Sequence, residues 1–265
     1  MAIKFGLEST PPLLGAGVRF VLAGVLLLGV AAAMRRPLRT DVRLAALLGA
    51  LPFALSYGLI YWGELHIPSG LAAVLFGVMP LYTAVLATAL LADERAHPRL
   101  FAGIAVALAG LAVAYSESVA LGDDELAYAG ALACLAAPLA SAAGNTAIKL
   151  RGAALDAVVL NGWAMLAGGA LLLAASAGAE AWDEAVWNGQ ALAAIGYLAV
   201  IGSAVPFVVL TLLLRELPSV TLSYISLLLP FGALAFGAAL YDEPVTPPAL
   251  AGAALVAAGL AVARR

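Results

Sequence analysis

Residues 68–114 read PSGLAAVLFGVMPLYTAVLATALLADERAHPRLFAGIAVALAGLAVA, and residues 218–263 read PSVTLSYISLLLPFGALAFGAALYDEPVTPPALAGAALVAAGLAVA. In both stretches a Pro-Ser pair is followed by a second proline, then by an Asp-Glu pair, and finally by the run AGLAVA. Sequence rich in alanine and leucine aligns with itself by chance. Two prolines and an acidic pair in the same order rarely do so, and the two stretches therefore predict an internal duplication.

The composition around these stretches indicates a membrane protein. The chain has 265 residues, of which 64% are hydrophobic and 11% charged, and its mean hydropathy is +1.04. Soluble domains have roughly 45–50% apolar and about 25% charged residues. The single Cys134 excludes an internal disulfide and a cysteine-based metal cluster. The net charge of −3 gives no reason to expect nucleic acid as a partner. The apolar composition predicts that the lipid bilayer surrounds the protein.

Apolar stretches of about 20 residues are the signal of transmembrane segments. Those of this chain are apolar on all sides and do not alternate with polar residues, which favours helices over the strands of a barrel. The sequence therefore predicts an all-α polytopic membrane protein. Nine full spans are expected, at residues 13–34, 44–65, 69–91, 100–115, 126–148, 157–177, 190–214, 219–241 and 248–263.

The beginning of the chain also has a counterpart further on. Residues 2–6 read AIKFG and residues 147–150 read AIKL, and at the same offset Gly24 falls on Gly169. A whole apolar span precedes Lys149, but almost nothing precedes Lys4. We therefore expect the first of ten helices to be represented only by its final part. The repeats are then residues 1–116, with the end of one helix and four further helices, and residues 126–265, with five helices.

A repeat of five helices places its two copies in opposite orientations across the membrane, and the distribution of charge agrees with this. If the loop at residues 35–43 is cytoplasmic, only Lys4 and Arg19 of the 13 Lys and Arg residues are left toward the outside. Basic residues gather on the cytoplasmic side of membrane proteins. We therefore expect a multi-pass protein of the cell membrane with a cytoplasmic C-terminus. Inverted repeats are typical of transporters that open alternately to each side.

The motifs resemble the EamA family of the drug/metabolite transporter superfamily. The likeness is carried by AIKFGLESTPP, GVRFVLAG around Arg19, and the two stretches DERAHPRLFAG and DEPVTPPALAG, each of which leads to AGLAVA. The resemblance covers essentially the whole chain and implies ten helices in two inverted halves. It also implies a secondary transporter that exports amino acids or related small metabolites. No cofactor is expected.

Two other functions compete with this interpretation. The first helix of the family helps to line the cavity, so a non-transporting truncated remnant is one alternative. A membrane-embedded enzyme is the other, but the chain has no HExxH or GxSxG motif. His66 and His97 are expected on opposite sides of the membrane, where they cannot share a metal ion. We therefore expect no enzymatic activity and no metal site.

The first candidates for the substrate pathway are prolines inside spans. Pro80 and Pro230 each remove a helical hydrogen bond and free a carbonyl four residues earlier, on Phe76 and Ser226. A free carbonyl in a membrane must face a cavity or find another partner. The alternative is a kink that serves packing alone. Pro52, Pro138 and Pro206 are expected to kink their helices similarly, with the same two interpretations.

A second set of candidates is polar or aromatic. Tyr57, Tyr61 and Glu64 follow one another at helical spacing and share a face, which predicts either a wall of the pathway or an interfacial belt. Single polar or aromatic side chains in other spans either line the pathway or bond a neighbouring helix; they are Tyr82, Asn145 and Asn161. Arg19 lies within or near the outer end of its span, and snorkelling toward the interface accounts for it.

The last candidates form a stripe. Ser219, Ser223, Ser226 and Pro230 lie on one helical face, which predicts hydroxyl groups and a free carbonyl in the pathway. The alternative is that these serines bond to carbonyls of their own helix. Elsewhere, small residues recur on one face of two spans and predict close helix packing or a homodimer interface; they are Gly103 and Gly110, and Gly252 and Gly259.

Overall fold

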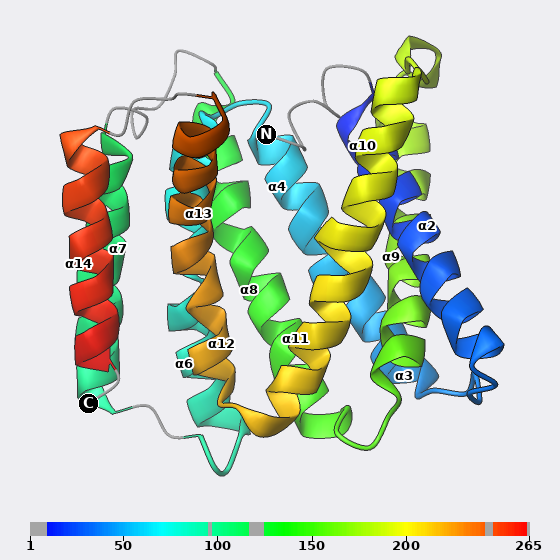
Figure 1. Ribbon diagram of the computed structural model, residues 1–265, viewed down its shortest axis with the longest axis horizontal. Helices are drawn as coiled ribbons and strands as arrows, with labels where there is room; N and C mark the ends of the chain where they lie inside the picture. Colours follow the sequence, from blue (N-terminus) through cyan, green and yellow to red (C-terminus); the bar gives the residue numbers. More distant parts are fainter. Residues whose placement is uncertain (1–9, 95–96, 117–124, 242–245, 264–265) are drawn as a thin grey trace. The chain divides into compact units, whose positions relative to one another are not determined.

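The computed structural model describes residues 10–94, 97–116, 125–241 and 246–263 (Figure 1). All regular structure in these ranges is helical. Lys4 and the second Asp-Glu pair, Asp242-Glu243, lie outside them. The elements are α2 (Pro12–Ala33), α3 (Val42–Leu48), η1 (Gly49–Ser56), α4 (Tyr57–Gly63), α5 (Ser69–Phe76), α6 (Met79–Leu90), α7 (Pro98–Ala114), α8 (Ala127–Arg151), α9 (Ala157–Ala179), η3 (Trp182–Glu184), α10 (Gly189–Ala199), η4 (Val200–Ala204), α11 (Val205–Glu216), α12 (Ser219–Ser223), α13 (Ile225–Tyr241) and α14 (Pro247–Ala263).

These helices make the chain a polytopic membrane protein. Six helical segments of the described residues are long and apolar enough to cross a bilayer, namely Pro12–Ala33, Val42–Gly63, Ser69–Leu90, Ala127–Arg151, Ala157–Ala179 and Gly189–Glu216. Each coincides to within a few residues with an expected span. Shorter apolar helices lie within or close to the other three expected spans, at Pro98–Ala114, Ser219–Gly232 and Pro247–Ala263.

The chain forms two compact units that are not continuous in sequence. The first unit comprises Met1–Trp62 and Ala143–Glu216, and the second comprises Gly63–Ala142 and Leu217–Arg265. Each unit therefore combines helices from both of the expected repeats.

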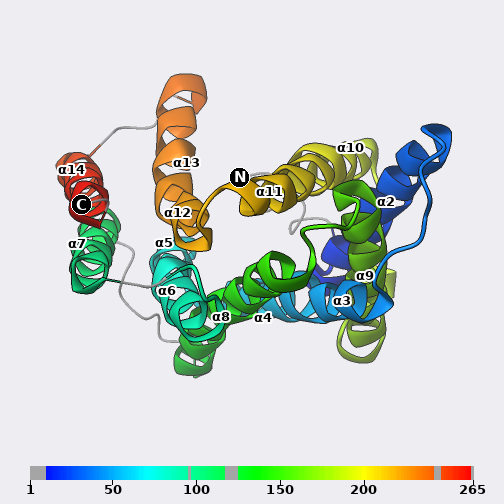
Figure 2. The same cartoon turned by 90° about the horizontal axis from the view of Figure 1, so that it is seen from below.

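In the first unit, α2 and α9 run antiparallel with their backbones in close approach. A Cβ atom added to Gly24 would lie 2.8 Å from the carbonyl oxygen of Gly162, and one added to Gly169 would lie 2.9 Å from the carbonyl oxygen of Gly17. Since helices in a bilayer associate through such small residues, four glycines determine how closely α2 and α9 can pack. Both views show these two helices side by side (Figures 1 and 2).

The second unit contains a similar pair, α7 and α14. A Cβ atom added to Gly103 would lie 2.5 Å from the carbonyl oxygen of Gly259, and one added to Gly110 would lie 2.8 Å from that of Gly252. The close packing predicted for these glycines is confirmed. Because each glycine face covers the other within one chain, the expected homodimer would need a different surface.

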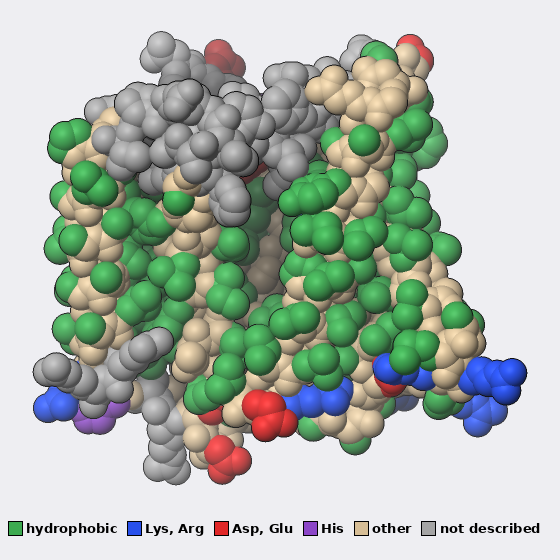
Figure 3. Space-filling view, in the orientation of Figure 1, with side chains coloured by type: hydrophobic (Ala, Val, Ile, Leu, Met, Phe, Trp, Pro, Cys, Tyr) green, Lys and Arg blue, Asp and Glu red, His purple; other side chains and the backbone are tan. Residues whose placement is uncertain are grey.

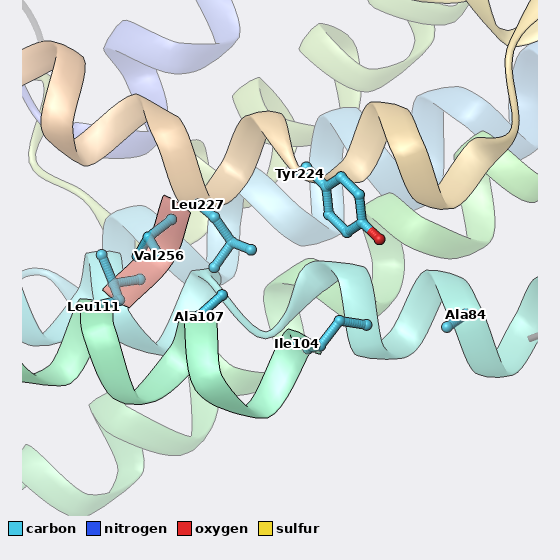
Figure 4. Packing of buried hydrophobic residues seen from close by; sticks show 7 residues of the cluster. All are labelled: Ala84, Ile104, Ala107, Leu111, Tyr224, Leu227 and Val256. Carbon is cyan, nitrogen blue, oxygen red and sulfur yellow. The ribbon is translucent and has the colours of Figure 1, made fainter. Parts of the chain in front are cut away.

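The core of the second unit lies where α7 meets its neighbours (Figure 4). Ile104, Ala107 and Leu111 come from α7, Ala84 from α6, and Val256 from α14, and all are at most 1% exposed. Tyr224 and Leu227, at the junction of α12 and α13, complete the cluster. This core thus joins helices that are far apart in the sequence.

In each unit, an acidic side chain at the end of one helix caps the first turn of another. Glu180, which follows α9, accepts hydrogen bonds from the backbone N–H groups of Leu13 (2.7 Å) and Leu14 (2.9 Å) in α2. Glu94 accepts from the backbone N–H (2.9 Å) and the hydroxyl (2.5 Å) of Ser219 in α12. A carboxylate is favourable there because the first N–H groups of a helix have no partner within it. The Glu94 contact gives a structural role to one member of the repeated Asp-Glu pair.

Charged residues of the first unit gather at the opposite end of α2. Arg36 pairs with Asp156 at 3.0 Å, and Arg151 pairs with Asp41 at 2.9 Å. Both aspartates also cap helices, Asp41 at α3 and Asp156 at α9. Where α2, α10 and α11 form the surface in Figure 3, their lengths are apolar and Lys and Arg side chains lie at this end.

These contacts affect the acidity of both aspartates. Burial alone would raise the pKa of Asp156, but hydrogen bonds from the backbone of Val159 and Val158 and from Arg36 together lower it. The pKa of Asp41 is lowered mainly by the hydrogen bond from the Leu44 backbone. A carboxylate with a lowered pKa stabilises the fold above its ordinary pKa, and this contribution is lost as the pH falls through the folded value.

Candidate functional site

The candidate site of the first unit is built on a cluster of aromatic rings. Phe20 from α2 lies 5.2 Å from Phe53 of η1 and 4.8 Å from Tyr57 of α4, measured between ring centroids. Phe207 of α11 lies 4.8 Å from Phe53, and Tyr61 lies 6.4 Å from Tyr57. Two of the predicted pathway residues, Tyr57 and Tyr61, are thus brought together with three phenylalanines that the sequence did not single out.

Two π-helical segments border this cluster. The segment η1 (Gly49–Ser56) contains Pro52, and η4 (Val200–Ala204) ends two residues before Pro206. The sequence predicted proline kinks at both places, and the structure has a wider helical turn at each. Such turns occur often at functional sites because they leave backbone groups outside the regular hydrogen-bond pattern.

Arg19 is buried against this cluster and does not snorkel. Its side chain extends from α2 to η4, where Nε donates to Ser203 Oγ at 2.7 Å and Nη2 donates to the Gly202 carbonyl at 2.9 Å. The guanidinium carbon lies 5.2 Å from the Phe20 ring centroid and 5.3 Å from that of Tyr57, within the range of cation–π attraction. Only 4% of the residue is exposed. The interpretation as a snorkelling residue is therefore wrong, because polar and aromatic partners are available inside the unit.

Two asparagines of the first unit have different surroundings. Asn161 of α9 donates to the Ala157 carbonyl and to Thr211 Oγ on α11, each at 2.8 Å. It therefore bonds a neighbouring helix, the structural alternative considered for it. Asn145 of α8, a predicted pathway residue, is buried, with 6% of its surface exposed.

In the second unit, the serine stripe is buried, and Ser223 and Ser226 donate hydrogen bonds to carbonyls of the same helical segment. Ser223 Oγ donates to the Val220 carbonyl at 2.6 Å, and Ser226 Oγ donates to the Ser223 carbonyl at 2.8 Å. These are the local bonds named as the alternative to a role in binding. Both hydroxyl protons are therefore engaged, and the oxygens could only accept a further hydrogen bond.

The repeated prolines of the second unit differ in their local structure. Pro80 stands near the start of α6, because the helical span is interrupted between Phe76 and Met79. Pro230 lies inside α13, and its own carbonyl accepts a hydrogen bond from the Tyr115 hydroxyl at 3.2 Å. Both prolines are buried.

The remaining predicted pathway residues of the second unit are half-buried, namely Glu64, Phe76 and Tyr82. Glu64 lies in the turn after α4, and the other two lie at the end of α5 and near the start of α6. The structure therefore places the ten predicted residues in two units. It joins Tyr57 with Tyr61, and Ser223 with Ser226, by direct contact.

Two hollows of the second unit contain none of the predicted residues. One of about 330 Å³ lies where the end of α6 meets α12, and Thr88, Asp93, Glu94, Thr221 and Tyr224 are among its lining residues. The other, of about 530 Å³, is lined only by apolar residues of α13 and α14. The first is at helix ends and the second is open along two helices, so neither favours a polar substrate within the membrane.

A family model and several relatives match this chain. The model of the EamA-like transporter family matches residues 1–116 and 128–265. The "Probable amino-acid metabolite efflux pump" of Salmonella typhimurium is 30% identical over 98% of this chain and 88% of its own. The "Uncharacterized inner membrane transporter YedA" of Escherichia coli strain K12 is 32% identical over 84% of this chain and 72% of its own.

Two further matches extend the comparison. The "S-adenosylmethionine/S-adenosylhomocysteine transporter" of Chlamydia trachomatis serovar L2 is 29% identical over 92% of this chain and 78% of its own. A crystal structure with 22% sequence identity superimposes with a TM-score of 0.80, over 98% of this chain and 90% of the other. The latter establishes similarity of fold. None of these matches indicates an enzymatic family.

Proposed function

Since the chain belongs to the EamA-like transporter family and is a membrane transporter, we propose that it exports amino acids or related small metabolites by alternating access. In this proposal it is a secondary transporter, which uses a gradient and not ATP. The observation that carries it is the reciprocal arrangement of the glycine contacts within both units. The names of two relatives support the substrate class, since one is named for amino-acid metabolites and one for S-adenosylmethionine.

The glycine contacts of the first unit cross over between matching positions. At an offset of 145 residues, Gly17 and Gly24 correspond to Gly162 and Gly169. In the structure, Gly24 meets Gly162 and Gly17 meets Gly169. Crossed contacts of this kind are what a two-fold relation between two copies produces.

The second unit has the same arrangement at an offset of 149 residues. Gly103 and Gly110 correspond to Gly252 and Gly259, while Gly103 meets Gly259 and Gly110 meets Gly252. Both arrangements support inverted repeats at residues 1–116 and 126–265. Two halves with such a relation can exchange conformations, and this exchange is the basis of alternating access.

The proposed pathway contains the residues predicted from sequence, with Tyr57 and Tyr61 as its best supported members because they belong to the aromatic cluster. The others are Glu64, Phe76, Pro80, Tyr82, Asn145, Ser223, Ser226 and Pro230. Apolar and aromatic surfaces next to hydrogen-bonding groups suit a small amphiphile such as an amino acid.

Transport by the purified protein in vesicles tests the proposal. We expect counterflow of radiolabelled amino acids without ATP, and an at least tenfold slower rate for Tyr57→Ala, since an aromatic contact and its packing, worth about 1.5–3 kcal/mol, are lost. Ser223→Ala and Ser226→Ala should change the rate by about threefold or less, because removing one weak acceptor costs about 0.5 kcal/mol.

Tyr128→Ala is the matched control, since Tyr128 is 74% exposed on α8 and should leave the rate unchanged. Wild-type protein that folds but moves no amino acid would favour the alternative of a non-transporting remnant. Normal rates in all three pathway variants would place the pathway elsewhere.

We also propose that the protein lies in the cell membrane with its C-terminus in the cytoplasm. Arg36 and Arg151 lie at one end of the first unit, and Arg215 donates a hydrogen bond to the Leu155 carbonyl at the same end. These three arginines support the proposed orientation, because basic residues gather on the cytoplasmic side. In a Cys134→Ala background, an impermeant thiol reagent should label Asp183→Cys in intact cells and should not label Arg36→Cys. The opposite labelling pattern would reverse the orientation.

A further inference from the structure

The guanidinium of Arg19 has N–H donors that make no hydrogen bond to the residues that the structure describes. A guanidinium group has five N–H donors. Two of them are engaged, by Ser203 and Gly202, and both acceptors belong to η4. The Nη1 atom is buried and has no hydrogen-bond partner among the residues that the structure describes. Unused donors of this kind are uncommon in a buried position, because each one has lost its hydrogen bonds to water.

The engaged and unused donors lie on different edges of the guanidinium plane. Nε and one proton of Nη2 form the edge that faces η4. The other proton of Nη2 and the two protons of Nη1 remain, and the two nitrogens form the outer edge of the fork. Two parallel N–H donors at this edge match the two oxygens of a carboxylate.

The charge of Arg19 has no acidic partner among the residues that the structure describes. Its contacts there are the hydroxyl of Ser203, the carbonyl of Gly202 and the rings of Phe20 and Tyr57. These groups stabilise a cation but do not neutralise it. A charge inside a membrane span is energetically costly and usually marks a functional position, where a counter-ion binds.

The corresponding place in the other half of the first unit has no charge. At the offset of 145 residues, Arg19 falls on Ala164 of α9. There the π-helical segment packs directly on the helix, since a Cβ atom on Gly49 would lie 2.7 Å from Ala167 Cβ and 2.9 Å from the Ala164 carbonyl oxygen. A Cβ atom on Gly202 of η4 would instead lie 3.2 Å from a side-chain carbon of Leu198 in α10 and 3.5 Å from Arg19 Nη2. The guanidinium of Arg19 thus lies against η4, whereas in the matching position η1 contacts α9 directly.

From these contacts we propose that the outer edge of Arg19, Nη1 and Nη2, binds the carboxylate of the transported substrate. Ser203 and Gly202 hold the guanidinium by its opposite edge, and Tyr57 lies beside it to contact the rest of the substrate. This inference rests on the proposed function and narrows it to substrates that carry a carboxylate. It also assigns the binding charge to one half of the transporter.

The test compares acids with their amides in vesicles of phosphatidylcholine alone, so that no anionic lipid can supply the counter-ion. The probes are the twenty L-amino acids and the corresponding L-amino acid amides, which keep the amine and lose the carboxylate charge. For those amino acids that the wild-type protein transports, we expect the half-saturating concentration of the amide to be at least about thirtyfold higher. Loss of a buried charge pair has at least this effect.

Variants of Arg19 then assign the preference to this side chain. Arg19→Gln should reduce the acid-to-amide preference to about threefold or less, through a loss of affinity for the acids. Arg19→Lys keeps the positive charge but loses the bidentate pair of N–H donors, and it should retain part of the acid-to-amide preference. Arg151→Gln removes a surface charge that pairs with Asp41 and should keep the wild-type ratio.

The ratio separates binding from folding, since a variant that merely loses stability loses acid and amide transport together. If Arg19→Gln does not fold, the wild-type ratio and Arg19→Lys still decide. Equal transport of acids and amides by the wild-type protein, or an unchanged ratio in a folded Arg19 variant, would overturn the inference and leave the proposed function standing. If neither set of probes is transported, the proposed export of amino acids fails and the inference fails with it.

Discussion

Replacing Gly110 with leucine is expected to separate α7 from α14 and to lower the free energy of unfolding by about 3 kcal/mol or more. A Cβ atom at Gly110 would lie 2.8 Å from both the Gly252 carbonyl oxygen and the Val256 backbone nitrogen. Both are backbone atoms of a helix, so neither can move aside as the end of a side chain could. Overpacking in a core costs about 1–3 kcal/mol even where side chains can rearrange, so a larger effect is expected here.

The matched control for this substitution is its sequence neighbour. Ala109→Leu adds a side chain of similar size to the same helix, but Ala109 is exposed on the surface of the second unit. It should change the stability by less than about 0.5 kcal/mol. The unfolding midpoint of the purified protein in detergent measures both. Equal midpoints for the two variants would show that α7 and α14 do not pack through these glycines.

The second large effect is expected at Gly24, where leucine should both destabilise the first unit and abolish transport. A Cβ atom there would lie 2.8 Å from the Gly162 carbonyl oxygen and 2.9 Å from the Leu166 backbone nitrogen. We expect a loss of about 3 kcal/mol or more in stability. Because Arg19 is on the same helix, displacement of α2 would also move its guanidinium away from Ser203.

Gly29→Leu is the control on the same helix, since a Cβ atom on Gly29 has no neighbour within 4 Å. It should leave both the unfolding midpoint and the rate of transport near the wild-type values. The comparison of the two variants in one vesicle preparation therefore separates close packing from helix propensity. A Gly24→Leu protein with normal transport would contradict the role assigned to the α2–α9 contact.

The sequence predicted the helices of this protein well because apolar length and helix-ending residues are local properties. The helix expected at residues 157–177 is found at Ala157–Ala179, and the one expected at 248–263 at Pro247–Ala263. The glycine faces were also predictable, since their spacing shows that small residues share one side. Their partners were not, because periodicity says which face is small and does not say what covers it.

The candidate site was less predictable, because it depends on contacts between distant residues. Pro52 predicted a disturbance of its helix, but not that η1 would become π-helical. The serine at position 226 predicted a hydroxyl in an apolar span, and only the structure shows that this hydroxyl donates to Ser223. For Arg19, a charge two turns inside an apolar span was the available signal, yet its partners on η4 are more than 180 residues away in the chain.

The pairing of α2 with α9 and of α7 with α14 has a consequence for how the chain is made. Synthesis proceeds from the N-terminus, so α2 and α7 are inserted while their partners are still absent. Lipid must cover the glycine faces of both helices until residues 157–263 have been translated. Exposure of these glycine faces to lipid has little cost, because lipid tails are as apolar as the side chains that later replace them. A break between α7 and α8 would leave each fragment with one half of both glycine interfaces. We therefore expect neither fragment to assemble alone. When both fragments are expressed in one cell, they should associate in the bilayer.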